Sequence, residues 1–208
     1  MHFLILAASL LLSASGGHAS SVTDQFVGKG RVLVLNSDNL EKAKPSDKVG
    51  CLNAKGDVVT LDQCAVFTRN ETWPHELYSS AGTCTFRDTT TVQNLASVYG
   101  KGSYAFSCSD VGDSVLKSAM WAGEPYYTVD GFNFPFVCTG NLNCYYEIER
   151  VPTSDKDSLP VWEYFWGSQQ MSVTPGHLQV MWLWDPVKDT SGVGGPKGSQ
   201  RRSVAFRG

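Results

Sequence analysis

The sequence holds few groups that exchange protons near neutral pH, because only 4 of its 208 residues are histidine. Two of them lie in an N-terminal segment that we expect to be removed, which leaves His75 and His177. The sequence also lacks a Gly-x-Ser-x-Gly elbow, a Walker loop, a dinucleotide fingerprint, a His-Glu-x-x-His motif and an EF-hand loop. These absences disfavour cofactor-dependent catalysis, so we expect no cofactor.

Long hydrophobic runs are scarce as well. The apolar run from Phe3 to Leu12 has about ten residues, whereas a membrane-spanning helix needs roughly twenty. Small residues follow it up to Gly17-His18-Ala19, as at a signal-peptidase site, although no Lys or Arg precedes the run. We therefore expect a signal peptide at residues 1–19 and a secreted, extracellular protein without a membrane anchor.

The cysteines lack the spacing of a metal site, because there is no Cys-x-x-Cys pair and no histidine near any of them. Six cysteines in an exported chain indicate three disulfides, for which fifteen pairings are possible. We expect the sequential pairing, since each neighbouring pair flanks a turn and closes a short loop, and we expect no metal. The cysteines are Cys51, Cys64, Cys84, Cys108, Cys138 and Cys144.

The charge is mildly acidic, with a formal net charge of -3, so nothing indicates a nucleic-acid-binding surface. The C-terminal residues 186–208 are rich in Gly, Ser and basic side chains, and we expect them to form a flexible basic tail that proteases can cut at Arg201-Arg202. Asn70-Glu71-Thr72 is the one N-glycosylation sequon, which agrees with export.

Residues 20–185 show the pattern of a single domain that is mainly β. Short segments rich in Val, Ile, Phe, Tyr, Trp and Thr recur about every ten residues, separated by turn residues, which predicts an antiparallel β-sandwich or barrel-like domain with little helix. Two segments leave the type open: Pro74–Ser80 fits one helical turn, and Val115–Trp121 fits helix or strand. The predicted strands are Arg31–Leu35, Asp57–Leu61, Ala65–Thr68, Thr83–Arg87, Tyr104–Cys108, Tyr126–Val129, Asn143–Glu149, Val161–Trp166 and Leu178–Trp184.

The sharpest catalytic hypothesis joins two of these strands. In strand geometry Glu147 and Glu149 lie on one face, and pairing with the strand that follows His177 would set the imidazole opposite one of them. A carboxylate and an imidazole on two sides of a phosphate can act as general base and general acid. The non-catalytic alternative is a pair of solvent-facing carboxylates with a surface histidine.

Tyr145-Tyr146-Glu147 followed by His177 resembles the small secreted fungal ribonucleases of the guanyl-specific class. The resemblance implies that a strand glutamate and a C-terminal histidine share the chemistry. It departs from that class because no arginine lies between them at a comparable place, since Arg150 comes too early and Arg201 too late.

Aromatic residues suggest a binding alternative. Trp162, Tyr164 and Trp166 share one face of their predicted strand and form either a platform that stacks on sugars or peptides, or a wall of the core. Core packing is favoured because these are the largest apolar groups of the chain.

The segment from Val49 to Thr68 predicts a hairpin with a turn at Lys55-Gly56-Asp57 and a Cys51–Cys64 bridge at its base. With its leader, paired cysteines and β-rich body, the chain resembles the small secreted cysteine-containing proteins of filamentous ascomycete fungi, many of them effector-like. The resemblance implies a host-interacting lifestyle more than a molecular activity, and it carries no catalytic residues onto this sequence. Because catalytic motifs are absent, the leading hypothesis is a non-enzymatic interaction protein that acts on a host or cell-wall protein or glycan. The ribonuclease-like hydrolase and the carbohydrate-binding module are the alternatives.

Overall fold

The computed structural model describes residues 26–73, 75–97, 103–110, 124–140, 143–164 and 172–187. The expected signal peptide, most of the expected tail, Trp166 and the segment Val115–Trp121 lie outside the described residues. Within them, no helix is of the length and apolarity that a membrane crossing requires.

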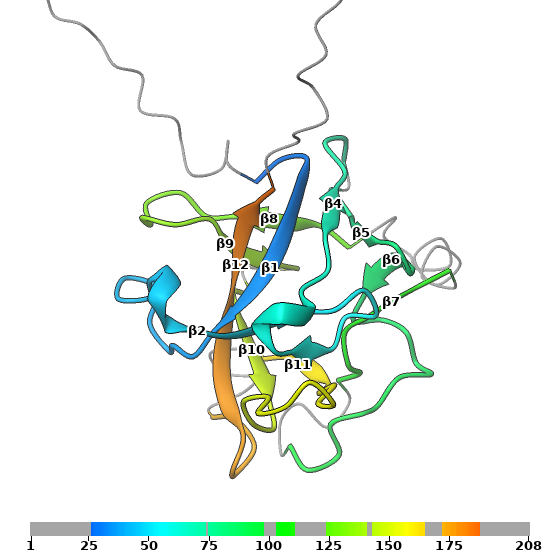
Figure 1. Cartoon of the computed structure of the whole chain (residues 1–208), viewed down its shortest axis with the longest axis vertical. Coiled ribbons are helices and arrows are strands. Elements are labelled where there is room, and N and C mark those ends of the chain that lie inside the picture. The colour runs from blue at the N-terminus through cyan, green and yellow to red at the C-terminus, as the bar shows by residue number, and fades with distance from the viewer. Residues whose placement is uncertain are drawn as a thin grey trace, which may run out of the picture.

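Twelve strands form one antiparallel sheet in the described part of the chain, with only two short 3-10 turns, at Pro45–Asp47 and Leu61–Gln63, beside them. The expected mainly β, antiparallel fold is confirmed, and the sheet is not closed into a barrel (Figure 1). The strands are β1 (Lys29–Leu35), β2 (Lys48–Leu52), β3 (Val58–Val59), β4 (Phe67–Arg69), β5 (Leu77–Ser79), β6 (Gly82–Thr85), β7 (Ser107–Ser109), β8 (Tyr126–Thr128), β9 (Phe136–Thr139), β10 (Tyr145–Ile148), β11 (Val161–Glu163) and β12 (Leu178–Pro186).

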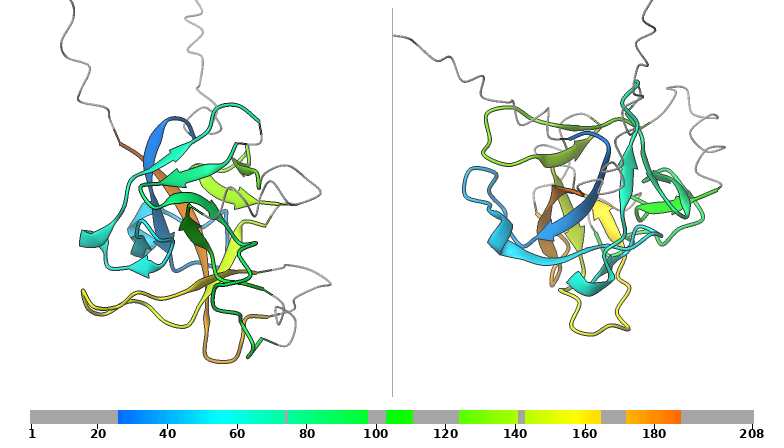
Figure 2. Two further views of the ribbon diagram at one scale, coloured as in Figure 1. Left: turned by 90° about the vertical axis from the view of Figure 1, so that its right-hand side faces the viewer. Right: turned by 45° about the horizontal axis from the view of Figure 1, so that its top comes forward.

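The strand path runs β11-β10-β12-β1-β4-β5-β6-β7, while β2 with β3, and β9 with β8, branch from β1 and β12. The two ends of this path approach each other, because the Phe106 amide beside β7 donates a 2.8 Å hydrogen bond to the Val161 carbonyl of β11. The views in Figure 2 show the strands wrapping around a common interior. The sheet is therefore strongly curved, with β7 and β11 joined by this hydrogen bond and no ladder.

The long pair β1 and β12 forms the centre of the fold and is buried on both faces. Because side chains alternate along a strand, Val32 and Trp182 enter one hydrophobic cluster while Leu33 and Met181 enter a second one on the other side. In the larger cluster the Trp182 ring stacks on Tyr146, with centroids 3.7 Å apart and planes 12° apart. The aromatic strands predicted near the C-terminus thus supply the core.

The cysteines pair in sequence order, as expected: Cys51–Cys64, Cys84–Cys108 and Cys138–Cys144. The first bridge ties the hairpin whose turn lies at Lys55-Gly56-Asp57, as predicted. Gly56 has φ +99°, and a Cβ atom there would lie 2.8 Å from a Phe106 ring carbon. The turn therefore needs glycine both for its backbone conformation and for its close approach to the chain beside β7.

Three elements differ from the prediction. The possible helical turn at Pro74–Ser80 is wrong, because Leu77–Ser79 forms β5 between β4 and β6. Strand β9 was not predicted, although its run Phe136-Val137-Cys138 is apolar and buried throughout. Strand β2 was not among the predicted strands, although most of its residues fell within the predicted hairpin from Val49 to Thr68. In each case pairing with neighbouring strands decides the structure, and a three- or four-residue segment carries too little periodicity to reveal that pairing.

Candidate functional sites

Glu147 and His177 form a direct pair. Glu147 lies on β10 between β11 and β12, its side chain is completely buried, and its Oε1 atom lies 2.6 Å from Nδ1 of His177. The same oxygen accepts hydrogen bonds from Asn94 Nδ2 at 3.0 Å and from the Thr174 amide at 3.1 Å. An oxygen that accepts from these donors acts as a carboxylate, so Nδ1 carries the proton toward it and Nε2 is left as the free ring nitrogen.

The imidazole is held from a second side by Trp162. The two rings are stacked, with centroids 5.7 Å apart and planes 13° apart, and the Trp162 Nε1 atom donates to the Val92 carbonyl at 3.0 Å. The His177 side chain is 15% exposed, and in the described part of the chain its Nε2 atom has no hydrogen-bond partner. The pair thus holds the imidazole in a fixed orientation with a small exposed fraction.

The predicted arrangement of the carboxylates is partly wrong. Strand register sets Glu147 opposite Gln179, so His177 reaches Glu147 diagonally, and Glu149 is exposed beyond the end of β10. The alternative of solvent-facing carboxylates is wrong for Glu147. The direct 2.6 Å contact also leaves no space for a phosphate between the two groups, so a general base and a general acid on opposite sides of a scissile bond do not fit this geometry.

Arg150 does not supply the missing arginine of the ribonuclease resemblance. Its guanidinium makes a bidentate contact with Asp157, at 3.0 Å and 2.7 Å, within the loop that follows β10. This ion pair lowers the pKa of the Asp157 carboxyl well below its usual range. Arg150 therefore organises a surface loop.

The predicted aromatic platform is buried where it is described. Trp162 is 2% exposed and Tyr164 is 5% exposed, while Trp166 lies outside the described residues. Neither described ring offers a face to solvent, and Trp162 is already stacked on His177. This burial matches the core alternative that the sequence favoured.

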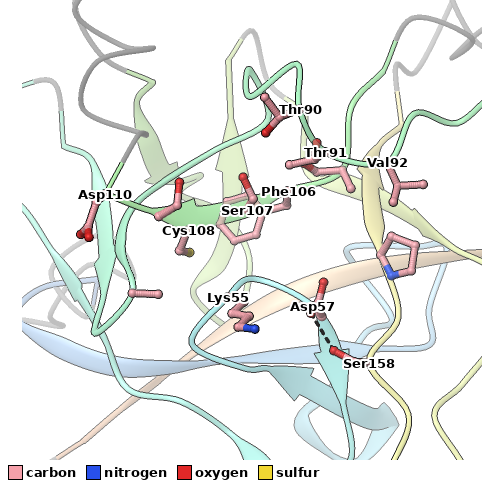
Figure 3. Close-up of a pocket in the computed structure, with 14 residues that line it drawn as sticks. Lys55, Asp57, Thr90, Thr91, Val92, Phe106, Ser107, Cys108, Asp110 and Ser158 are labelled. Atoms are coloured by element: carbon pink, nitrogen blue, oxygen red, sulfur yellow. Dashed lines mark hydrogen bonds between the residues drawn. The ribbon is translucent and has the colours of Figure 1, made fainter.

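A groove of about 610 Å³ lies between the hairpin turn at Lys55 and the chain around β7 (Figure 3). Such a volume falls in the usual range for ligand sites, about 300 to 1,000 Å³. The Cys51–Cys64 bridge ties the hairpin that carries one wall, and Cys108 of the Cys84–Cys108 bridge lines the other. The lining residues are Lys55, Asp57, Ala81, Thr90, Thr91, Val92, Ala105, Phe106, Ser107, Cys108, Ser109, Asp110, Ser158 and Pro160.

Polar groups of the groove fall into two kinds. Asp57 is engaged, because its carboxylate accepts a 2.6 Å hydrogen bond from the Ser158 hydroxyl, which Figure 3 draws as a dashed line. Lys55 and Asp110 are exposed, and neither forms an ion pair within the described structure. Within the described structure the groove therefore offers an ammonium group and a carboxylate without ion-pair partners, on a framework held by disulfides.

A second buried carboxyl group lies on the opposite face of β10 and β11. Glu124 is 3% exposed, accepts from the Thr85 hydroxyl at 2.5 Å and from the Phe86 amide, and lies 4.0 Å from Arg87 Nε. Burial raises its pKa. Burial and the nearby charge of Glu124 raise the pKa of Glu163 on β11 to about 8. Glu163 is therefore largely protonated at neutral pH.

Sequence reasoning missed the groove and the partners of both buried carboxyl groups. Asn94, Thr174 and Glu124 lie in loops whose sequences carry no distinguishing pattern, and only the folded chain brings them to the strands. The sequence predicted Lys55-Gly56-Asp57 as a hairpin turn. It did not predict that this turn lies beside β7, where Lys55 and Asp57 line the groove. Within the described ranges, no group of three or more His, Cys, Asp or Glu side chains is arranged to hold a metal ion.

Fold and sites together define the class of the protein as a disulfide-bonded, antiparallel β-sheet protein with a surface groove that carries charged side chains. Comparisons with protein-family models, with curated proteins and with solved structures found no match for this chain. Functional reasoning therefore rests on the chemistry of its own residues.

Proposed function

We propose that this chain is a secreted, extracellular, non-enzymatic interaction protein, effector-like in the manner of small secreted fungal proteins, that recognises a host or cell-wall partner through the groove beside Lys55. The observation that carries the proposal is the groove itself, which combines free charged groups with hydroxyls on a rigid frame. Rigid frames reduce the entropy cost of binding. The three disulfides support the proposed export after removal of residues 1–19, since disulfides persist in oxidising compartments.

The chemistry of the groove favours a glycan as the partner. Thr90 and Ser107 present hydroxyl oxygens that donate to Asp88 at 2.7 Å and 3.5 Å and can still accept hydrogen bonds from a sugar. Asp110 adds an exposed carboxylate that suits the hydroxyls of a sugar. Val92 and Pro160 add apolar surface for the C–H faces of a sugar ring. Binding through Trp162 and Tyr164 would need both rings to leave the core, so the groove replaces the aromatic face as the proposed carbohydrate site.

A glycan array that carries chitin, β-glucan and host-surface oligosaccharides tests this proposal with the purified full chain. We expect at least one oligosaccharide class to be retained by the wild type and lost by the double variant Lys55→Ala/Asp110→Asn. The matched control is Lys42→Ala/Asp38→Asn, which removes the same charges from exposed positions outside the groove. An array without any retained glycan, or equal retention by both double variants, would refute the groove as a glycan site.

A second candidate function is a ribonuclease-like hydrolase, and the 2.6 Å contact between His177 and Glu147 favours it. In this reading His177 alone moves protons through Nε2, while the Glu147 carboxylate holds the ring in its orientation. This role differs from the two-sided scheme suggested by the sequence. It supplies a proton acceptor, whereas a group that stabilises phosphate charge is still required.

Cleavage of a defined RNA oligonucleotide tests the second candidate. If His177 is the proton-transfer group, His177→Ala abolishes cleavage, Glu147→Gln lowers kcat strongly, and Glu149→Gln, two residues along the same chain but exposed, leaves it unchanged. Cleavage that persists in His177→Ala would assign the activity to a contaminant or another site. Absence of cleavage by the wild type would leave the interaction protein as the sole proposal.

A further inference from the structure

The tip of the β4–β5 hairpin carries the sequon Asn70-Glu71-Thr72 next to the most exposed large hydrophobic side chain of the described residues, Trp73 at 72%. The hairpin projects from the body of the molecule in Figure 1. Its tip is ordered by hydrogen bonds from the Asn70 amide to the Glu76 carbonyl at 2.8 Å and from the His75 amide to the Thr72 carbonyl at 2.9 Å. An exposed indole of this size is typical of a surface that another group covers.

The Asn70 side chain is arranged with its amide nitrogen free. Its Oδ1 atom accepts hydrogen bonds from the Thr72 amide at 3.1 Å and the Thr72 hydroxyl at 2.9 Å. Among the described residues its Nδ2 atom has no hydrogen-bond partner, and the residue is partly exposed. The folded hairpin can therefore carry a large substituent on Nδ2 without losing a hydrogen bond.

His75 links Asn70 to Trp73. The His75 Nδ1 atom lies 3.2 Å from the Asn70 carbonyl oxygen, and its ring meets the Trp73 ring at 85°, with centroids 5.9 Å apart. His75 has φ +63°, a conformation uncommon outside glycine, asparagine and aspartate. Because the ring planes are nearly perpendicular, His75 covers at most one face of the indole. The other face stays available on the same tip as Nδ2 of Asn70.

We propose that Asn70 carries an N-linked glycan whose first sugar, an N-acetylhexosamine, lies on the exposed face of Trp73. The proposal rests on export, which belongs to the proposed function, but it does not depend on the groove. In the modification Nδ2 forms a bond to the anomeric carbon of a lipid diphosphate-linked oligosaccharide. The carbon–oxygen bond to the diphosphate breaks, Nδ2 loses one proton, and the lipid diphosphate leaves with the electron pair. The apolar face of the sugar then covers the indole and removes it from water.

Expression of the full chain behind a heterologous leader in a eukaryotic secretory host tests attachment. We expect a glycan-sized mass increase that is removed by peptide-N-glycosidase, is absent in Asn70→Gln and in Thr72→Ala, and is retained in Trp73→Ala. A secreted wild-type chain without this increase would overturn the proposal. The heterologous leader separates this result from the question of whether residues 1–19 direct export.

A double-mutant cycle tests the packing on Trp73. Unfolding by urea is measured for the wild type and for Trp73→Ala, each with and without enzymatic removal of the glycan, so that the Asn-to-Asp change left by the enzyme cancels. We expect the glycan to lower the unfolding equilibrium constant about three- to tenfold more in the wild type than in Trp73→Ala. Equal effects in both backgrounds would overturn the packing. So would a concentration-dependent dimer of the unglycosylated chain that Trp73→Ala abolishes, since a second copy would then be the partner of the indole.

The experiments distinguish a failure of the glycan proposal at the β4–β5 tip from a failure of the proposed binding function of the groove. Loss of oligosaccharide binding in Lys55→Ala/Asp110→Asn concerns the proposed function, whereas the mass increase and the cycle concern only the β4–β5 tip. Trp73→Ala is expected to bind the array glycans as the wild type does.

Discussion

The cluster around Glu147 and the groove beside Lys55 both contain charged side chains, but these side chains have different hydrogen-bond environments. One oxygen of Glu147 accepts hydrogen bonds from a side-chain amide, a backbone amide and an imidazole inside the protein. In the groove, Lys55 and Asp110 are exposed and form no ion pair within the described structure. Saturated polar groups stabilise the fold, while free polar groups on a rigid frame are available to a partner. We therefore propose a stabilising role for the first region and a recognition role for the second.

The largest effect is expected from removing the disulfide that frames the groove. Cys84→Ala/Cys108→Ala should lower the free energy of unfolding by about 2 to 5 kcal/mol, because the bridge closes a loop of 24 residues in the unfolded chain. Cys138→Ala/Cys144→Ala, which opens a loop of 6 residues, should cost less. Urea unfolding measures both. Equal losses would show that loop closure does not dominate.

Removal of the buried carboxylate should also destabilise the protein. Glu147→Ala leaves the donors of Asn94, Thr174 and His177 unpaired in the interior, so we expect a loss of about 2 to 4 kcal/mol by urea unfolding. Glu149→Ala, at an exposed position, should change stability by less than about 0.5 kcal/mol. A loss for Glu147→Ala as small as that for Glu149→Ala would show that the Glu147 cluster does not stabilise the fold.

Glu163 provides a contrast with Glu147 on the opposite face of the same two strands. In the unfolded chain its carboxyl group ionises near pH 4.5, whereas in the folded chain it keeps its proton until about pH 8. The unfolded state therefore binds fewer protons between these values, and stability should decline from pH 4.5 to pH 8 and then level off. Allowing for partial exposure of the side chain, the decline due to this group should be about 1 to 3 kcal/mol.

The measurement for Glu163 is the difference between the wild type and Glu163→Gln in free energy of unfolding across this pH range. The variant cannot ionise at this position, so the free energy of unfolding of the wild type should fall relative to that of the variant between pH 5 and pH 8. The charged neighbours, Glu124 and Arg87, are present in both proteins and largely cancel in the difference. A difference that does not depend on pH would contradict the raised pKa.

Much of the fold was predictable from the sequence because its signals are local. Regularly spaced β-rich segments gave the antiparallel architecture, and turn residues such as Lys55-Gly56-Asp57 gave the hairpin. The sequential disulfides followed from short loops between neighbouring cysteines. Short strands such as β5 and β9 escaped prediction because tertiary pairing, and not periodicity, determines them.

The sites were less predictable because they join residues that lie far apart in the chain. The alternation of side chains along the strands predicted that His177 could lie near Glu147. It could not predict the diagonal contact between them or the burial of Glu147. Asn94 lies 53 residues from Glu147, and Glu124 lies 38 residues from Phe86, so no spacing rule connects either pair. The groove likewise exists only because the Gly56 turn lies against Phe106.

The most direct test of the division between the two regions is a binding titration with the oligosaccharide that the array retains. We expect Lys55→Ala/Asp110→Asn to weaken binding by about tenfold or more, the loss of roughly 1.4 kcal/mol or more of binding free energy, while His177→Ala binds as tightly as the wild type. Unchanged affinity in the groove variant together with lost affinity in His177→Ala would contradict the proposed division and place recognition at the Glu147 cluster.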